Sequence, residues 1–131
     1  MGKKTEVIQR CFEVVAELDA DMTNEVYRKF SEASPEAIQY IEDMDERTRG
    51  RMLDQVYTLL MGESENEYLK FETRMHEGYG ANSGFYQSFL LAVKASVQEV
   101  LNGSWSSVED AAWTDMINEI IVKVEGFQTK I

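Results

Sequence analysis

Apolar residues recur every three or four positions along most of the chain, the spacing that places them on one face of an α-helix. The first such stretch covers residues 5–18, and the second covers residues 21–32 with Thr23 or Asn24 as its N-cap. The strict alternation of apolar and polar residues that is typical of half-buried strands is absent from the sequence. The pattern therefore predicts an all-α protein.

Turn and cap signals divide the rest of the chain. Ser34, Pro35 and Glu36 predict the start of a short helix, because serine caps a helix well and proline suits its first turn. The highly charged residues 42–49 predict a corner or a frayed turn. The later segments with helical spacing are 51–61 ending at Gly62, 68–76 closed by Gly78 and Gly80, 85–101, and a last helix capped by Ser106 or Ser107. Six to seven helices with short corners are predicted, in one domain over residues 1–131.

Composition narrows the class of protein. A hydrophobic content of 44% and a charged content of 28% are those of a soluble globular protein. The single cysteine, Cys11, excludes a disulfide framework, and with one histidine it excludes an all-protein Cys/His zinc site. We expect Cys11 to be a small core residue. No apolar run approaches the about 20 residues of a membrane span, and no signal-peptide core is present, so a cytoplasmic protein is expected.

The net charge is −11, from 24 acidic and 13 basic residues. A charge of this sign repels phosphate backbones and anionic lipid, so neither nucleic acid nor membrane is an expected partner. The acidic residues are spread along the chain, which indicates solvated helix faces. Enzyme templates give no match, because there is no phosphate-binding glycine loop after a strand and no pair of Glu-x-x-His motifs for a di-iron site.

His76 is the only histidine, and it lies directly before a glycine-containing loop. Neutral imidazole is a good axial ligand for iron, and its second nitrogen needs a partner that fixes the ring. A lone histidine on a helix is otherwise a surface or packing residue, and that alternative stays open on this residue alone.

Three blocks of sequence together resemble the globin family, in particular bacterial single-domain and sensor-type globins. Tyr27 lies eight residues before Pro35, which is similar to the second globin helix running into a proline-led third helix. His76 followed by Tyr79-Gly80-Ala81 and then Tyr86 resembles the His-x-x-Tyr-Gly-Val loop of many bacterial globins. The segment 103–113, with Trp105 and Trp113, resembles the corner before the last globin helix. The resemblance covers residues 5–126.

The resemblance implies a globin-like fold of six to seven helices around a haem b, with His76 as the iron ligand. Tyr27 and Arg49 take positions on the distal side, where the Tyr27 hydroxyl would offer a hydrogen bond to bound oxygen. Gly50 resembles the small residue at which two globin helices cross. The other residues that the resemblance places around haem are Phe71, Met75, Ala81, Phe89, Leu90 and Val93 on the proximal side and Ile41, Met52, Leu53 and Val56 on the distal side.

The chain departs from the family's pattern at two positions. Ile41 stands where globins carry a phenylalanine that stacks on haem, and Glu72 stands where they carry leucine. A carboxylate that faces haem is costly unless it reaches solvent or a partner. Both departures keep open a globin-fold domain without haem that regulates a partner.

The expected function is reversible binding of oxygen or nitric oxide for storage, sensing or detoxification. The alternatives are a haem-free globin-fold interaction domain and, more remotely, an unrelated helical regulator. We expect no enzyme activity from the chain alone, since nitric oxide dioxygenation would need an external reductase. A homodimer or a signalling partner is compatible with either reading. With one histidine per chain, bis-histidine ligation within the chain is impossible, so the sixth iron position is expected to be open; the alternative is a non-histidine cap from Tyr27, Met52 or Met44.

Overall fold

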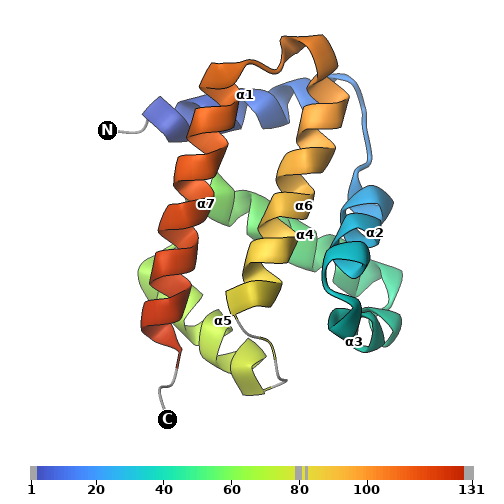
Figure 1. Ribbon diagram of the computed structural model, residues 1–131, viewed down its shortest axis with the longest axis vertical. Coiled ribbons are helices and arrows are strands. Elements are labelled where there is room, and N and C mark those ends of the chain that lie inside the picture. The colour runs from blue at the N-terminus through green and yellow to red at the C-terminus, as the bar shows by residue number, and fades with distance from the viewer. Residues whose placement is uncertain (1–2, 79–80, 82, 129–131) are drawn as a thin grey trace.

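The computed structural model describes residues 3–78, 81 and 83–128, and within them it contains seven α-helices, two short 3-10 helices and no strand (Figure 1). The predicted all-α class is confirmed. The helices are α1 (Lys3–Glu17), α2 (Thr23–Ala33), η1 (Pro35–Ala37), α3 (Ile38–Glu42), α4 (Glu46–Leu60), α5 (Asn66–Gly78), α6 (Ser83–Leu101), η2 (Asn102–Ser104) and α7 (Ser107–Phe127). Across these described segments, none of the helices has the length and apolar character needed to cross a membrane.

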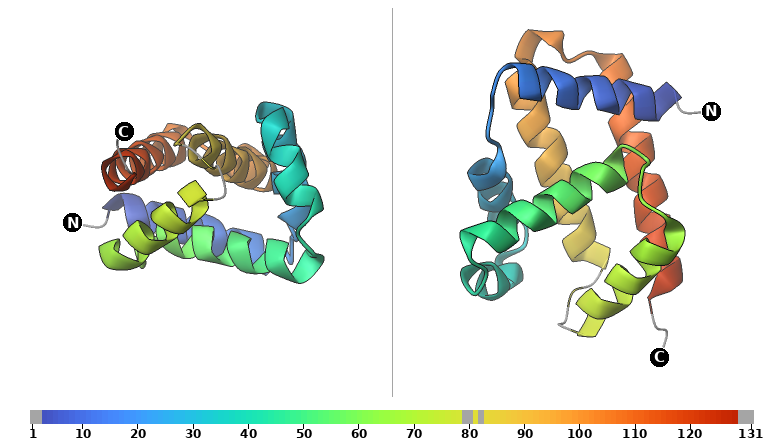
Figure 2. Two further views of the ribbon diagram at one scale, coloured as in Figure 1. Left: turned by 90° about the horizontal axis from the view of Figure 1, so that it is seen from below. Right: turned by 180° about the vertical axis from the view of Figure 1, so that it is seen from behind.

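The helices pack in two layers (Figure 2). The two long helices α6 and α7 lie side by side in one layer, and α1, α4 and α5 lie in the other. Helix α2 packs along α6 and also contacts α4, and the short α3 follows it at the same end of the molecule. Helix α6 therefore contacts α1, α2 and α7, which makes it the central element of the fold.

Aromatic side chains of α1, α4 and α7 pack together in the hydrophobic core. Trp113 is fully buried, and its ring lies 5.5 Å from that of Phe12, which in turn lies 4.5 Å from that of Tyr57. The indole nitrogen of Trp113 donates to the sulfur of Cys11 at 3.5 Å. Burial raises the pKa of the Cys11 thiol, which is consistent with the core position expected for this cysteine.

Helix starts follow local capping chemistry, and two of them differ from the predictions. Helix α2 has Met22 at its N-cap, and the carboxylate of Asp21 accepts from the backbone N–H of Thr23 at 3.0 Å, so the predicted cap at Thr23 or Asn24 is wrong. Helix α4 begins at Glu46 because Asp45 caps it by accepting from a backbone N–H at 2.8 Å. The second half of the charged segment 42–49 is therefore helix and not a corner.

The end of α4 and the start of the last helix agree with the sequence. Gly62 has a φ of +76°, the left-handed conformation in which helices commonly end. Ser106 caps α7 in a capping box with Glu109, whose side chain accepts from the Ser106 backbone N–H at 2.8 Å.

Gly62 is a position where a side chain would be strained. A Cβ there would lie 2.8 Å from Cγ2 of Thr5 on α1, and it would also force φ into a region that side chains disfavour. We expect Gly62→Ala to lower the free energy of unfolding by about 1–3 kcal/mol. Adding Thr5→Ser, which removes Cγ2, should recover part of the loss.

Gly50 offers the matched control in the helix that ends before Gly62. A Cβ at Gly50 meets nothing within 4 Å, so Gly50→Ala should leave stability unchanged or raise it by up to about 1 kcal/mol. Urea unfolding followed by circular dichroism measures both changes. Equal effects at Gly62 and Gly50 would contradict the assignment of strain to the α4–α5 turn.

Candidate functional site

His76 lies in the last turn of α5 and contacts α6. Its ring nitrogen Nδ1 is 3.0 Å from the hydroxyl oxygen of Tyr86, and the two rings meet edge to face with centroids 6.0 Å apart. The side chain is 31% exposed. The backbone N–H of Ala81 donates to the carbonyl of His76 at 3.1 Å, which holds the chain close to the end of α5. Tyr79 and Gly80, the other members of the predicted loop motif, lie outside the described residues.

The Tyr86 hydroxyl has a second partner on the helix that carries His76. Thr73, buried on α5, shares a hydrogen bond with Tyr86 and donates its own proton to the carbonyl of Leu69 at 2.8 Å. If Nδ1 of His76 carries the ring proton, the Tyr86 hydroxyl accepts from it, and in the other tautomer the Tyr86 hydroxyl donates to Nδ1. The first of these tautomers leaves the other imidazole nitrogen, Nε2, with its lone pair, which is the form that binds a metal.

Burial keeps Tyr86 in its neutral form. Removal from water raises the pKa of Tyr86 to about 12, although the hydrogen bond with Thr73 acts in the opposite direction. The phenol is therefore uncharged at neutral pH and remains able to take part in the hydrogen-bond chain.

Glu72 lies one turn before His76, at the position where the globin pattern has leucine. Its oxygen Oε2 is 3.9 Å from Nδ1 of His76, and the side chain is only 15% exposed. A hydrogen bond with Glu72 is the main cause that raises the pKa of Tyr68, and burial raises it further. Gln55 donates to the Tyr68 hydroxyl at 2.9 Å. The carboxylate thus has partners on α5, so its desolvation is compensated.

A second polar cluster joins α2, α3 and α4. The hydroxyl of the buried Tyr27 donates to the backbone carbonyl of Arg49 at 3.0 Å. The Arg49 guanidinium donates through Nη2 to the carbonyl of Ile41 at 2.7 Å and lies 5.9 Å from the centre of the Tyr27 ring. Its Nε is buried and has no hydrogen-bond partner among the residues described here. Burial raises the pKa of Tyr27, which Arg49 only partly offsets, so its hydroxyl keeps its proton.

The predicted wall residues divide into a buried set and an exposed set. Buried are Ile41, Leu53, Phe89, Leu90 and Val93, and partly buried are Met52, Val56 and Ala81. The Tyr27 and Phe89 rings lie 5.4 Å apart, edge to face. Phe71 is 63% exposed and Met75 is 40% exposed, because Leu69 and Thr73 occupy the inward face of α5. The structure therefore does not bring Phe71 or Met75 into the cluster.

Helix α6 links the two clusters. Tyr86 holds His76, and Phe89, one turn later on the same helix, packs on Tyr27. The sequence prediction missed Thr73, although its position three residues before His76 places it on the same side of a helix. The spacing of four residues between Glu72 and His76 likewise signals a contact.

Comparisons with known proteins do not assign a family. No protein-family model matches the chain, and a search of curated proteins finds no match. The contacts described above and the resemblance in sequence are therefore the basis for a functional proposal.

Proposed function

We propose that the chain is a globin-type haem protein that binds a diatomic gas. The observation that supports this most directly is the contact of its one histidine with Tyr86. The Tyr86 hydroxyl lies 3.0 Å from Nδ1 of His76, and when Nδ1 donates to it, Nε2 keeps a free lone pair. Metal-binding histidines are commonly fixed in this way by a partner on the second nitrogen.

The residues around the two clusters suit a haem group. His76 would bind its iron, and the apolar side chains of Leu53, Phe89 and Val93 would contact the flat ring. Bound haem would supply an iron centre with one position left for a gas molecule. Helix α6 would connect the two clusters, because it carries the side chains that contact His76 and Tyr27.

The unpartnered nitrogen of Arg49 supports a ligand site beside Tyr27. A buried donor without a partner is rare in native proteins and is costly to the fold. Here that donor belongs to a guanidinium already held by Ile41 and lying near the Tyr27 ring. A small polar ligand at this position would accept from Arg49 Nε and from the Tyr27 hydroxyl, and both groups favour a ligand that carries negative charge.

Two further features favour the alternative, a haem-free globin-fold regulator. Ile41 in place of phenylalanine removes a stacking contact, and Tyr27, Phe30 and Phe89 pack against one another in a continuous core. Such a domain would act by binding a partner protein. Such a domain would not take up added haemin, which distinguishes this alternative from the first proposal.

Gas binding by the reconstituted protein tests the proposal. Protein supplied with haemin and reduced with dithionite should change its absorbance spectrum when carbon monoxide is added. Removal of the gas should restore the starting spectrum. A reduced protein whose spectrum does not respond to carbon monoxide, oxygen or nitric oxide would contradict gas binding. If the protein binds gas, the association and dissociation rates of the gas would separate storage, sensing and detoxification. Dioxygenase turnover would be tested with an added reductase.

Tyr86→Phe should weaken the hold on His76 without disturbing the core. Loss of the hydroxyl removes the hydrogen-bond acceptor of Nδ1, worth on the order of 1 kcal/mol, so haem dissociation should be about five- to ten-fold faster. Transfer of haem to apomyoglobin measures this rate. Tyr57→Phe is the matched control, since Tyr57 is a partly buried tyrosine on α4 that packs on Phe12. Equal rates in both variants would mean that Tyr86 does not position His76.

A further inference from the structure

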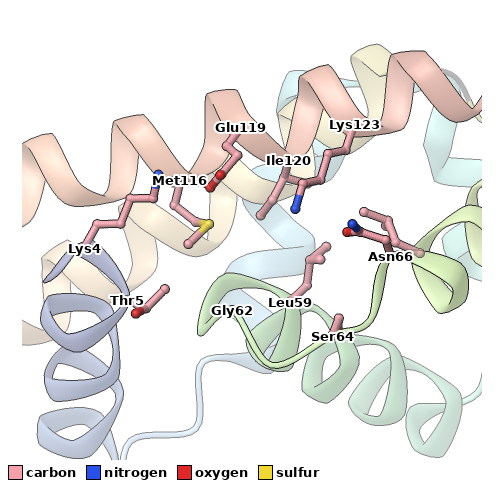
Figure 3. Close-up of a pocket in the computed structure, with 11 residues that line it drawn as sticks. Lys4, Thr5, Leu59, Gly62, Ser64, Asn66, Met116, Glu119, Ile120 and Lys123 are labelled. Carbon is pink, nitrogen blue, oxygen red and sulfur yellow. Dashed lines mark ion pairs between the residues drawn. The ribbon is translucent and has the colours of Figure 1, made fainter. Parts of the chain in front are cut away.

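A cavity of about 360 Å³ lies apart from the two clusters that surround His76 and Tyr27 (Figure 3). It is formed by the first residues of α1, the turn between α4 and α5, and the middle of α7. The close approach of Gly62 to Thr5 brings the turn against α1 and forms one side of the cavity. None of the residues that line it belongs to the candidate haem site.

The cavity has an apolar floor and a polar rim. The floor consists of Leu69, Met116 and Ile120, each no more than 5% exposed. The rim carries Lys4 and Glu119 at one end, and Lys123 and Asn66 at the other. Figure 3 shows the Lys123 ammonium and the Asn66 amide pointing toward the same part of the cavity. This division suits a ligand with one polar end and one apolar end.

The charges at the rim favour an anion. Lys4 pairs with Glu119 at 3.1 Å, so these two charges compensate each other. Lys123 makes no ion pair with any residue in the ranges 3–78 and 83–128. The cavity therefore has a surplus of one positive charge in a chain whose net charge is −11. One surplus charge matches a monoanion, whereas phosphate esters carry about two negative charges and would be repelled by the chain as a whole.

We propose that this cavity binds a small monocarboxylate with an apolar tail. The carboxylate would accept from Lys123 and Asn66, and the tail would cover Met116 and Ile120. A water molecule occupies about 30 Å³ in the liquid and a methylene group is of similar size, so the cavity admits a ligand of on the order of ten heavy atoms. A straight-chain acid such as octanoate has this size. The proposal does not depend on haem binding.

Methyl NMR with octanoate as the probe tests the proposal on the full chain, with and without haemin. The methyl group of Met116 should shift on titration with a Kd on the order of 1 mM, as expected for a ligand of this size. The methyl group of Met52, which does not line the cavity, should not shift. Octylammonium has the same tail and the opposite charge, and it should bind at least about ten-fold more weakly.

Variants at Lys123 test whether octanoate binding depends on the charge of this side chain. Lys123→Gln should weaken octanoate binding about ten-fold, the effect of losing one charge-assisted hydrogen bond, and Lys123→Arg should retain it. Lys70→Gln is the matched control, because Lys70 does not line the cavity. Equal binding of octanoate and octylammonium, a shift at Met52 in place of Met116, or unchanged affinity in Lys123→Gln would each overturn the proposal.

Discussion

His76→Ala should abolish haem ligation while the chain remains folded. The imidazole is the only one in the sequence, and no second histidine is present to replace it. Haemin affinity should fall by at least about a hundred-fold, since a metal–nitrogen bond is worth more than the roughly 2.7 kcal/mol that this factor represents. The sharp Soret band should be lost, and added free imidazole should restore it by filling the space left by the side chain.

Lys70→Ala, on the same helix and outside both clusters, controls for general damage to α5. Far-ultraviolet circular dichroism should show the helix content of both variants unchanged, because the His76 side chain is partly exposed and is not a core residue. A His76→Ala protein that binds haemin as the wild type does would show that another side chain ligates the iron.

Tyr27→Phe should raise the rate at which oxygen leaves the reduced protein by about ten-fold. In the structure the Tyr27 hydroxyl donates to the carbonyl of Arg49 at 3.0 Å. When the Tyr27 hydroxyl donates to a gas ligand instead, a neutral hydrogen bond is exchanged for a charge-assisted one. The two hydrogen bonds differ in strength by about 1–2 kcal/mol. The gain is therefore smaller than the full strength of the new bond.

Stopped-flow mixing with carbon monoxide measures the oxygen dissociation rate. Tyr40→Phe is the control, because Tyr40 is an exposed tyrosine on the neighbouring α3. Removal of the Tyr27 hydroxyl also removes its hydrogen bond to the Arg49 carbonyl, so stability should fall by about 1 kcal/mol. An unchanged oxygen rate together with this loss of stability would identify Tyr27 as a structural residue only.

The helices were predictable from the sequence because their apolar spacing is a local property. Gly62 and Ser106 also act locally, so the ends that they set agree with the predictions. The start of α4 was missed because seven of the eight residues 42–49 are charged or polar and show no apolar spacing, while a single carboxylate at Asp45 is enough to cap the helix. The cap of α2 was displaced because Asp21, two residues before Thr23, supplies the acceptor for the Thr23 N–H.

The candidate site was predictable only in part. The positions of His76 and Tyr86 follow from their motif, and the structure places their side chains in contact. The contact of Arg49 with the Ile41 carbonyl depends on how α3 meets α4, which no local pattern encodes. The exposure of Phe71 depends on which face of α5 turns inward, and apolar residues on both faces leave that choice to tertiary packing.

The central claim, that His76 holds a haem, is tested most directly by titrating the purified wild-type chain with haemin. The claim predicts a Soret band that grows linearly and stops at one haemin per chain, since the sequence has one histidine. It also predicts that the bound haem stays with the protein through gel filtration. A spectrum that remains that of free haemin, or one that rises without a break at one equivalent, would contradict the claim.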